Sequence, residues 1–446
     1  MPKVYTELMT SLFSQRIDLN RRIEVVGRGK ALRERLQVRD CEYVSTIPLR
    51  SKASKRADVA WVQSYLAGLP IQAPQPTRTL RAVDLFCGSG GLTTGLKHAA
   101  RSLGIRIDLA LACDADLEAL EVYRANHGPL LTSGTDVQTL VNYHIAGRGN
   151  DASWSTWPTL IDPHLAGFLA DLDVLVAGPP CQGHSNLNNK TRRNDSRNLL
   201  YLTTVAFAVA SGAKLCIIEN VPDVLNDSQE VVRSARALLV KSGYKIDDAV
   251  LSADDFGVPQ KRRRHFLVAV RNSKYEFELK SLVEALRARA VVTVRHAIGD
   301  LMRVKSGGNF DSPAALSSEN LRRIDWLFDH DEYDLPDRHR PKCHQSGHTY
   351  PSVYGRMKWD EPAQTITGGF LTPGRGRFIH PGAHRTVTPH EAARLQSFPD
   401  SYGFQLDGRL LPRSLFGKII GDAVPPLLAR AIAIAGLALL AEVVPE

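Results

Sequence analysis

The stretch Val174-Leu175-Val176-Ala177-Gly178-Pro179-Pro180-Cys181-Gln182-Gly183-His184-Ser185 is a short apolar run that stops at Gly-Pro-Pro and then presents a cysteine. An apolar run bounded by turn residues is typical of a parallel strand buried on both faces. Two consecutive prolines cannot donate to a ladder, so the strand ends there. Cys181 is therefore placed at the carboxyl edge of a sheet, where open α/β sheets collect ligands. By itself the stretch fits an inert buried cysteine equally well.

Strands and helices alternate on both sides of this stretch. Residues 80–86 predict a strand that runs into Cys87-Gly88-Ser89-Gly90-Gly91 and then a helix at 92–100. A strand, a glycine turn and a helix N-terminus form a nucleotide-type cradle. A second strand at 107–112 leads to Asp114, whose carboxylate is placed to accept hydrogen bonds from ribose hydroxyls. A helix N-cap role explains Asp114 or Asp116 equally well.

The later elements lead to the same sheet edge. Asp136 follows a possible third strand, and residues 138–167 are a poorly periodic insertion. A polar, basic loop follows Cys181, and a strand at 214–218 then delivers Glu219 and Asn220 beside the cysteine. Residues 244–251 and 264–270 predict an antiparallel pair at the end of the sheet. Helices are expected after Pro389 and after Pro426.

The two remaining regions differ from this core in charge. The chain of 446 residues has a net charge of +9, and residues 1–80 hold 14 Lys/Arg against 7 Asp/Glu. Helical patterning to about residue 36 and a short helix near 59–66 predict a basic, helical N-terminal extension at 1–79. Such an excess favours polyanion partners, although a solvated helical face explains it equally well. Between 271 and 365, 15 Lys/Arg and 14 Asp/Glu nearly cancel, which indicates a separate small domain.

Cysteine usage and hydropathy indicate the compartment. The six cysteines are scattered without a CxxC pair, so we expect a reducing cytoplasm, no disulfides and no metal site. The N-terminus lacks the pattern of a signal peptide. The apolar segment 431–441 is too short to span a bilayer, and we expect a core helix there and no membrane partner.

Taken in order, these motifs resemble those of the DNA cytosine-C5 methyltransferase family, of the bacterial restriction-modification type, over most of residues 81–440. Asp84 to Gly91 resembles the family's S-adenosylmethionine loop, Pro179 to Gln182 its nucleophile motif and Glu219 to Val221 its cytosine-binding motif. Further matches are Gln260-Lys-Arg262-Arg-Arg264 to the QxRxR motif, and the segments 385–396 and 421–426 to the last two signature blocks.

The resemblance implies an α/β fold of the class I S-adenosylmethionine-dependent methyltransferases, with a Rossmann-like mixed sheet and a small target-recognition domain. It divides the chain into the N-terminal extension at 1–79, a catalytic domain at 80–270, a target-recognition domain at 271–384 and a C-terminal return to the catalytic domain at 385–446. In this family the final helix packs beside the cofactor-binding half, which accounts for its apolar sequence.

The implied activity is DNA (cytosine-5-)-methyltransferase, EC 2.1.1.37, acting on a flipped-out cytosine in a specific duplex sequence. Carbon 5 of cytosine is a poor nucleophile, and addition of the Cys181 thiolate at carbon 6 makes it reactive. A neighbouring cation such as Arg262 or Arg264 favours the thiolate. Glu219 is expected to donate a proton to ring nitrogen 3, Arg264 to hold the exocyclic oxygen, and Asn220 to order the site. The base that removes the carbon 5 proton is not identified.

The resemblance also implies the ligand contacts. The cofactor S-adenosyl-L-methionine is expected at a set of residues along the sheet edge, namely Asp84, Phe86, Gly88, Gly90, Gly91, Asp114, Asp136, Pro180 and Asp422. DNA contacts are expected from the loop after the cysteine and from the recognition region, at Ser185, Arg192, Arg193, Arg197, Gln260, Thr365 and Thr367. Further candidates for reading the target sequence are Arg356, Lys358, Arg375 and Arg377.

Four positions depart from the family pattern. The family usually has Asn at Asp422, Phe or Tyr at His184, Glu at Asp114 and a bulky side chain at Ala115. These differences affect cofactor contacts or loop packing without removing a catalytic group.

Other functions remain as alternatives. A catalytically silent DNA-binding protein would not need Cys181, Glu219 and the two arginines. A tRNA cytosine methyltransferase would carry Cys-Phe-Thr, which is absent from the chain. A nicotinamide dehydrogenase would explain the glycine turn but not Pro-Pro-Cys. The expected partners are double-stranded DNA and a cognate restriction endonuclease, and we expect a cytoplasmic monomer associated with the nucleoid.

Overall fold

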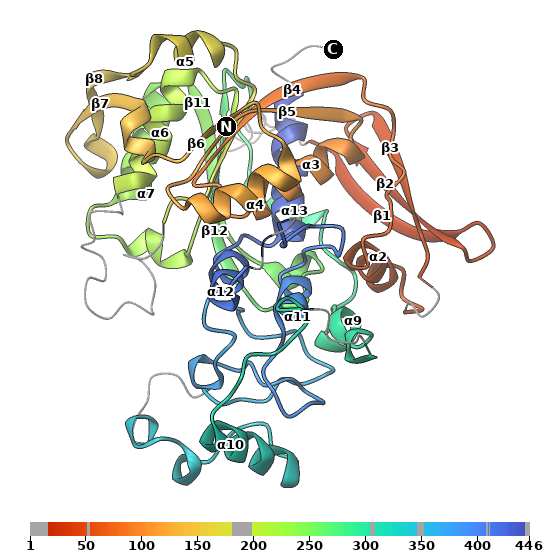
Figure 1. The fold of residues 1–446 in the computed structure, drawn as a ribbon. Helices are drawn as coiled ribbons and strands as arrows, with labels where there is room; N and C mark the ends of the chain where they lie inside the picture. The colour runs from red at the N-terminus through yellow and green to blue at the C-terminus, as the bar shows by residue number, and fades with distance from the viewer. Residues whose placement is uncertain are drawn as a thin grey trace, which may run out of the picture.

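The computed structural model describes residues 17–50, 54–180, 199–303, 308–345, 352–406, 409 and 411–441. Its centre is a seven-stranded sheet with the strand order β11-β12-β10-β9-β4-β5-β6 (Figure 1). Five of these strands are parallel, and the last two in the chain, β11 and β12, form the antiparallel end. The strands are β4 (Arg78–Leu85), β5 (Ile105–Cys113), β6 (Leu131–Ser133), β9 (Val174–Ala177), β10 (Leu215–Asn220), β11 (Tyr244–Ser252) and β12 (Arg263–Arg271).

Helices cover both faces of this sheet because its central strands are apolar on both sides. Alternate residues of β4 and β9 enter two different cores: Ala82 and Val176 face one, and Val83 and Leu175 face the other. The first core holds α3 (Gly91–Ser102), α4 (Leu117–His127) and α13 (Pro426–Leu440), and the second holds α6 (Leu200–Ser211) and α7 (Val231–Lys241). The predicted class I methyltransferase sheet, including its antiparallel end pair, is confirmed.

The chain reverses direction across the sheet between β4 and β9. From β4 it continues to β5 and β6 on one side, and it then returns to β9 and continues to β10 on the other. Ligands of open α/β sheets bind at such a switch point, outside the carboxyl ends of the strands. The glycine turn after β4 and the Pro-Pro segment after β9 both lie there.

The last helix is buried in the first core. The helical segment at residues 413–440 is long and apolar enough to cross a membrane. However, 94% of an apolar 18-residue stretch within it is buried inside the protein. The segment comprises α12 (Arg413–Gly421) and α13, and α13 packs along α3 with Gly95 against Ala429. The predicted core helix at 431–441 is thus confirmed.

The region between β6 and β9 is an ordered hairpin. After the 3₁₀ turn η1 (Val137–Leu140), β7 (Val141–Ala146) pairs with β8 (Ser153–Leu160), with η2 (Gly149–Asp151) between them and α5 (Pro163–Phe168) after them. The hairpin packs on α6, where the hydroxyls of Tyr143 and Thr203 are 2.8 Å apart. Two register shifts in the hairpin break the period-2 pattern that would have revealed it in the sequence.

From residue 17 to residue 50 the chain forms strands, so the helical patterning predicted for this described part of the N-terminal region is wrong. The strands β1 (Leu19–Val26), β2 (Ala31–Val38) and β3 (Cys41–Pro48) form a three-stranded antiparallel sheet beside α13, and only α2 (Ala57–Leu66) matches the predicted short helix (Figure 1). Along β2 the buried positions are Leu32, Glu34, Leu36 and Val38, with period 2. Because one of these four positions is a glutamate, the sequence of β2 does not show the apolar alternation that is typical of a half-buried strand.

Buried charges attach this sheet to the rest of the protein. The Glu34 carboxylate accepts hydrogen bonds from Arg430 of α13 at 2.6 and 3.1 Å and from Arg21 of β1 at 2.7 Å. Both guanidinium groups lie about 5 Å from the ring centre of Trp61, a distance suited to cation–π attraction. Burial alone would raise the pKa of Glu34, but the two arginines outweigh it and lower this pKa to about 2. The sheet is therefore an integral part of the fold and not a loose arm.

The exposed face of the sheet carries charges of both signs. Glu24 lies 3.3 Å from Arg33 and 3.2 Å from Arg35, and Arg35 lies 2.7 Å from Glu42. These charges neutralise one another, whereas Arg22 on β1 and Arg28 and Lys30 in the turn between β1 and β2 are exposed.

Described residues between 308 and 388 form most of a lower lobe (Figure 1). A small separate core contains Ile324, Leu327, Leu335, Val353 and Ile379. By contrast, α8 (Leu279–Glu284) and α9 (Val294–Ile298) pack into the first core, so the packing of the small lobe begins later than residue 271. The other helical segments are η4 (Pro222–Asn226), η5 (Ala253–Phe256), η6 (Leu301–Arg303), α10 (Ser318–Asp329), η7 (Asp337–His339), η8 (Lys342–His344), η9 (Pro373–Arg375) and α11 (Pro389–Leu395).

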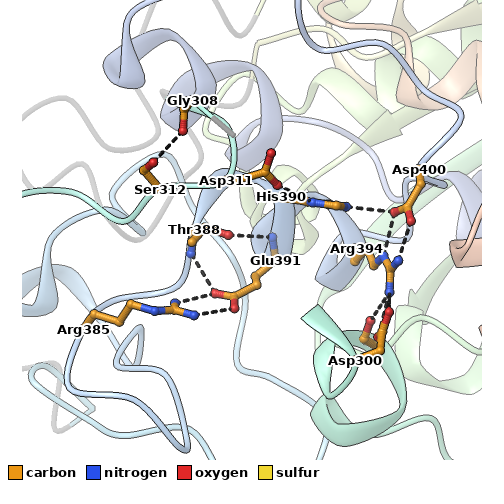
Figure 2. A network of polar contacts seen from close by, with 11 residues as sticks. Asp300, Gly308, Asp311, Ser312, Arg385, Thr388, His390, Glu391, Arg394 and Asp400 are labelled. Carbon is orange, nitrogen blue, oxygen red and sulfur yellow. Dashed lines mark hydrogen bonds and ion pairs between the residues drawn. The ribbon is translucent and has the colours of Figure 1, made fainter. Parts of the chain in front are cut away.

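A network of charged side chains on α11 joins the lobes (Figure 2). His390 lies between two carboxylates, with Nδ1 2.8 Å from Asp311 and Nε2 2.9 Å from Asp400. Arg394 also contacts Asp400, and its guanidinium lies 2.9 Å from Asp300 near η6. Burial alone would lower the pKa of His390, but the two carboxylates raise it above its ordinary value. The imidazolium therefore helps to fix the start of the lower lobe on the core.

Candidate active site

The glycine turn after β4 has a backbone that few residues could adopt. Phe86, Gly88 and Gly90 have positive φ angles of 54°, 50° and 88°. A Cβ on Gly90 would lie 2.4 Å from the His127 ring, and one on Gly91 would lie 2.2 Å from the Val424 carbonyl oxygen. The turn is thus packed tightly against α4 and the segment before α13. On its other side, space is open within 4 Å of the Cβ position of Gly88.

Asp84 lies beneath this turn as a buried carboxyl group. Its Oδ2 accepts a hydrogen bond from Thr93 at 2.6 Å, and the Thr93 hydroxyl is 2.8 Å from that of Tyr123. Its Oδ1 is buried and has no hydrogen-bond partner among the described residues. Burial, assisted by the nearby Asp114 charge, raises the pKa of Asp84 to about 7. An unpaired carboxylate oxygen of this kind fits a cationic ligand group, such as the ammonium of S-adenosylmethionine.

Asp114 and Asp116 have different roles, which the sequence alone left open. Asp116 caps α4 by accepting hydrogen bonds from the backbone of Glu118 and Ala119, and it is paired with Lys418 of α12. Asp114 accepts a hydrogen bond from the Gly88 backbone at 2.7 Å, which connects the second strand to the glycine turn. Burial raises the pKa of Asp114, while its backbone hydrogen bonds oppose this rise. Asp114 is therefore the carboxylate that lies at the cradle.

The third predicted cofactor carboxylate is on the neighbouring strand. Asp136 is exposed beyond the end of β6 and accepts a hydrogen bond from the Gln138 backbone at 3.0 Å. The strand order β4, β5, β6 thus places Asp84, Asp114 and Asp136 along one edge of the sheet, where ligands of open α/β sheets bind.

The segment that leads to the predicted nucleophile is fixed by the next strand. Pro179 and Pro180 follow β9, and the Asn220 side chain donates a hydrogen bond to the Pro179 carbonyl at 3.3 Å. The other end of the same amide accepts a hydrogen bond from the Val221 backbone at 2.8 Å. Asn220 therefore orients the Pro-Pro turn. Cys181 itself lies outside the described residues, as do His184, Ser185, Arg192, Arg193 and Arg197.

Glu219 and Arg264 form a buried ion pair beside this turn. Glu219 is the last residue but one of β10, Arg264 lies on β12, and the guanidinium Nε is 2.7 Å from Oε1. Burial raises the pKa of Glu219, even though Arg264 and Arg262 both lower it. Its Oε2 lies 3.8 Å from the Cβ position of Gly178, so the carboxyl group is next to the strand that carries the Pro-Pro turn. A buried carboxyl whose pKa is raised is suited to general-acid work.

Two predicted site residues just before β12 contact other parts of the protein. Arg262 is buried and donates hydrogen bonds to the carbonyl oxygens of Ile366 at 2.8 Å and Gly421 at 3.2 Å. It joins the lower lobe to α12, so its effect on Glu219 is that of a nearby charge. Gln260 has no exposed surface and binds Leu395, Gln396 and Ile366 through its amide. The predicted DNA contact of Gln260 does not fit this burial.

Three further predicted residues are Thr365, Thr367 and Asp422. Thr365 donates to the Lys261 carbonyl at 2.9 Å, and Thr367 accepts a longer bond from the Gly369 backbone at 3.4 Å. Asp422 follows α12 and is exposed, next to the close contact between Gly421 and Gly368. Thr365, Thr367 and Asp422 therefore lie at the junction between the lobes.

Two of the candidates for sequence reading are held inside the lower lobe. Arg356 lies 4.0 Å from the ring centre of Phe328, and Arg377 donates to the Arg356 carbonyl at 2.9 Å. Lys358 is paired with Glu361 at 3.0 Å, and Arg375 is exposed on η9. Arg375 is thus the most available of the four to a ligand.

Sequence reasoning missed several residues that support the cradle. Thr93 and Tyr123 hold Asp84, Lys418 pairs with Asp116, and the Tyr402 hydroxyl donates to the Ser89 carbonyl. Only Thr93 had a local signal, since it lies in the first turn of the helix after the glycines. Among the described residues no group of three His, Cys, Asp or Glu side chains is arranged to hold a metal ion.

The switch point, the glycine cradle and the adjacent Glu219–Arg264 pair define a class I methyltransferase with a second reactive centre beside its cofactor cradle. The chain belongs to the C-5 cytosine-specific DNA methylase family, whose model matches residues 80–436. It is therefore a DNA cytosine-5 methyltransferase by family.

Named relatives agree with this assignment. The chain is 37% identical to the type II methyltransferase M1.BsuMI of Bacillus subtilis, over 80% of each chain. It is 31% identical to the type II methylase M.HgiDII of Herpetosiphon aurantiacus, over 79% of this chain and 93% of the relative. The fold is similar to that of a prophage-encoded DNA modification methyltransferase from E. coli, with a TM-score of 0.55, 23% identity and coverage of 81% of this chain and 100% of the other.

Proposed function

We propose that this chain transfers a methyl group from S-adenosylmethionine to carbon 5 of a flipped-out cytosine in a specific duplex DNA sequence, through a covalent adduct of Cys181. The observation that carries the proposal is the buried Glu219–Arg264 pair beside a Pro-Pro turn that Asn220 orients. The cofactor supplies an electrophilic methyl group when bound.

The residues of the cradle fit this cofactor. The unpaired Oδ1 of Asp84 and the open space beside Gly88 support a site for the methionine portion, and we assign Asp114 to the ribose and Asp136 to the adenine. Phe86, Gly90, Gly91, Pro180 and Asp422 complete the proposed binding site. The positive charge of the cofactor would favour the ionised form of Asp84.

The chemistry of the protein residues follows from their surroundings. The Cys181 thiolate adds to carbon 6 of cytosine, and the Glu219 proton moves to ring nitrogen 3, so that the ring carries no net negative charge and carbon 5 becomes nucleophilic. Arg264 fixes the Glu219 carboxyl and is near enough to hold the exocyclic oxygen. After methylation at carbon 5, that carbon loses its proton to a base and the thiolate is released. Ring nitrogen 3 returns its proton to the Glu219 carboxylate, which restores the neutral ring.

The biological role proposed is DNA modification in a restriction-modification system. The two relatives described above are both named as type II methylases, and such enzymes protect DNA from a cognate endonuclease. Duplex DNA and that endonuclease are thus the proposed partners.

A covalent trap tests the mechanism directly. In DNA containing 5-fluorocytosine, the fluorine at carbon 5 cannot leave as a proton, so an enzyme adduct should persist after methyl transfer. We expect the wild-type chain, with S-adenosylmethionine, to form a complex that survives denaturation, and Cys181→Ala to form none. Glu219→Gln should form the complex slowly, because it lacks the proton donor. A wild-type chain that methylates DNA without forming this complex would refute the covalent role of Cys181.

A further inference from the structure

The basic run after Gln260 alternates between buried and exposed side chains. Gln260 and Arg262 are buried and hold the lobes together, whereas Lys261 and Arg263 are exposed. The residue that follows, Arg264, belongs to the pair with Glu219. Lys261 and Arg263 are therefore two exposed cations that flank Arg262 in the sequence and precede Arg264, and neither is among the residues assigned to catalysis or cofactor binding.

The backbone that carries these two cations is held on both sides. The Lys261 amide donates to the Ala363 carbonyl at 2.8 Å, and its own carbonyl accepts from Thr365 at 2.9 Å. Arg263 begins β12 and pairs in register with Ser252 of β11. The positions of both Cα atoms are thus fixed by the core, although the side chains point to solvent.

Neither cation has an ion-pair partner among the described residues, although Lys261 is close enough to Glu361, which is paired with Lys358, to help lower the pKa of that carboxyl. Across the described residues, no carboxylate lies within ion-pair distance of Lys261 or Arg263, whereas exposed arginines elsewhere, such as Arg233 and Arg295, are paired at 2.6 and 2.8 Å. Unpaired cations on a rigid backbone beside a nucleic-acid active site are suited to phosphate groups, which position a strand without reading its sequence.

We propose that Lys261 and Arg263 bind adjacent phosphates of the DNA strand that carries the target cytosine. Residues two apart on an extended chain are separated by about 7 Å, which is comparable with the spacing of neighbouring phosphates along one strand. A strand held by Arg263 would bring its flipped base to the Glu219–Arg264 pair. This inference rests on the proposed function, because it assigns these two residues to the same DNA substrate.

The test compares the double variant Lys261→Gln/Arg263→Gln with two controls. Arg101→Gln removes an exposed cation from the last turn of α3, which runs back from the glycine turn to the opposite edge of the sheet. Lys261→Arg/Arg263→Lys keeps both charges. Binding is measured on a duplex free of 5-methylcytosine as a function of salt. Each lost phosphate contact should reduce the slope of log K against log salt by about 0.9, and two should weaken binding by roughly 10- to 100-fold at moderate salt.

We expect the double variant to raise KM for DNA while kcat at saturating DNA stays close to wild type, and both controls to behave like wild type. An unchanged salt slope and KM in the double variant would overturn the proposal, and so would an equal loss in Arg101→Gln. S-adenosylmethionine binding, measured in parallel by calorimetry, should be unchanged and reports correct folding. If the wild-type chain bound the cofactor but methylated no DNA, the proposed function would fail. If it methylated DNA and the double variant bound DNA as well as wild type, only this inference would fail.

Discussion

The buried pair between Glu34 and Arg430 gives a quantitative prediction about the N-terminal sheet. Replacing Glu34 with Gln leaves Arg430 buried without its counter-charge, and Arg430 is 4% exposed. Breaking a buried pair in this way costs about 3–5 kcal/mol. Glu34→Gln should therefore lower the free energy of unfolding by roughly that amount.

The pKa of Glu34 gives an independent magnitude. A carboxyl whose pKa falls from 4.5 to about 2 on folding contributes about 3 kcal/mol of stability above the unfolded pKa. Because the folded pKa is the lower one, this contribution is present at neutral pH and is lost as the pH falls from about 4.5 towards 2. The Glu34→Gln variant should lack this component of the acid sensitivity.

Urea denaturation of the wild type and the variant, followed by tryptophan fluorescence, measures the effect because both arginines that bind Glu34 lie about 5 Å from the ring centre of Trp61. The matched control is Glu24→Gln, which removes a half-exposed carboxylate from the outer face of the same sheet. It should change stability by no more than about 1 kcal/mol. A loss below about 1 kcal/mol in Glu34→Gln would refute the conclusion that the extension is docked through this pair.

The remaining predictions concern the cradle and the catalytic pair. Glu219→Gln should reduce kcat, measured by methyl incorporation, by roughly 10²- to 10⁴-fold. Its cofactor affinity, measured by calorimetry, should change little. A variant that is as fast as the wild type would exclude Glu219 as the acid. Gly90→Ala should weaken cofactor binding and stability, because its Cβ would meet the His127 ring, whereas Gly27→Ala, which has a similar positive φ and open space, should cost only about 1 kcal/mol. Since burial raises the pKa of Asp84 to about 7, cofactor affinity should rise as the pH increases through this value. The same titration should be flat in Asp84→Asn, and an equal slope in both proteins would contradict the assignment.

The sheet could be predicted from the sequence because its strands are apolar on both faces and end at turn residues. Val174 to Ala177 stops at Pro179, and the strand before Cys87 runs into glycines, so local chemistry fixed both the elements and their edge. The roles of the two carboxylates after β5 could not be predicted from local sequence. Only the folded structure shows that Asp116 caps α4 and that Asp114 accepts a hydrogen bond from the Gly88 backbone.

The N-terminal sheet could not be predicted for a physical reason. A glutamate such as Glu34 is expected at an exposed position unless its buried partners are known. One of those partners, Arg430, is nearly 400 residues away in the chain. Similarly, the sequence shows five basic or potentially basic residues after Gln260 but not their directions. In the structure the side chains of Arg262 and Arg264 are mostly buried, whereas those of Lys261 and Arg263 are exposed. Arg262 and Arg264 therefore make contacts within the protein, and Lys261 and Arg263 are available to a ligand.

Sequencing of 5-methylcytosine in DNA from cells that express the chain, with Cys181→Ala as the control, tests the central claim most directly. We predict 5-methylcytosine in one recurring sequence context in the wild type and its complete absence in the Cys181→Ala variant. Unmethylated DNA in cells that contain the folded wild-type protein, or an equal level of methylation in the variant, would contradict the account.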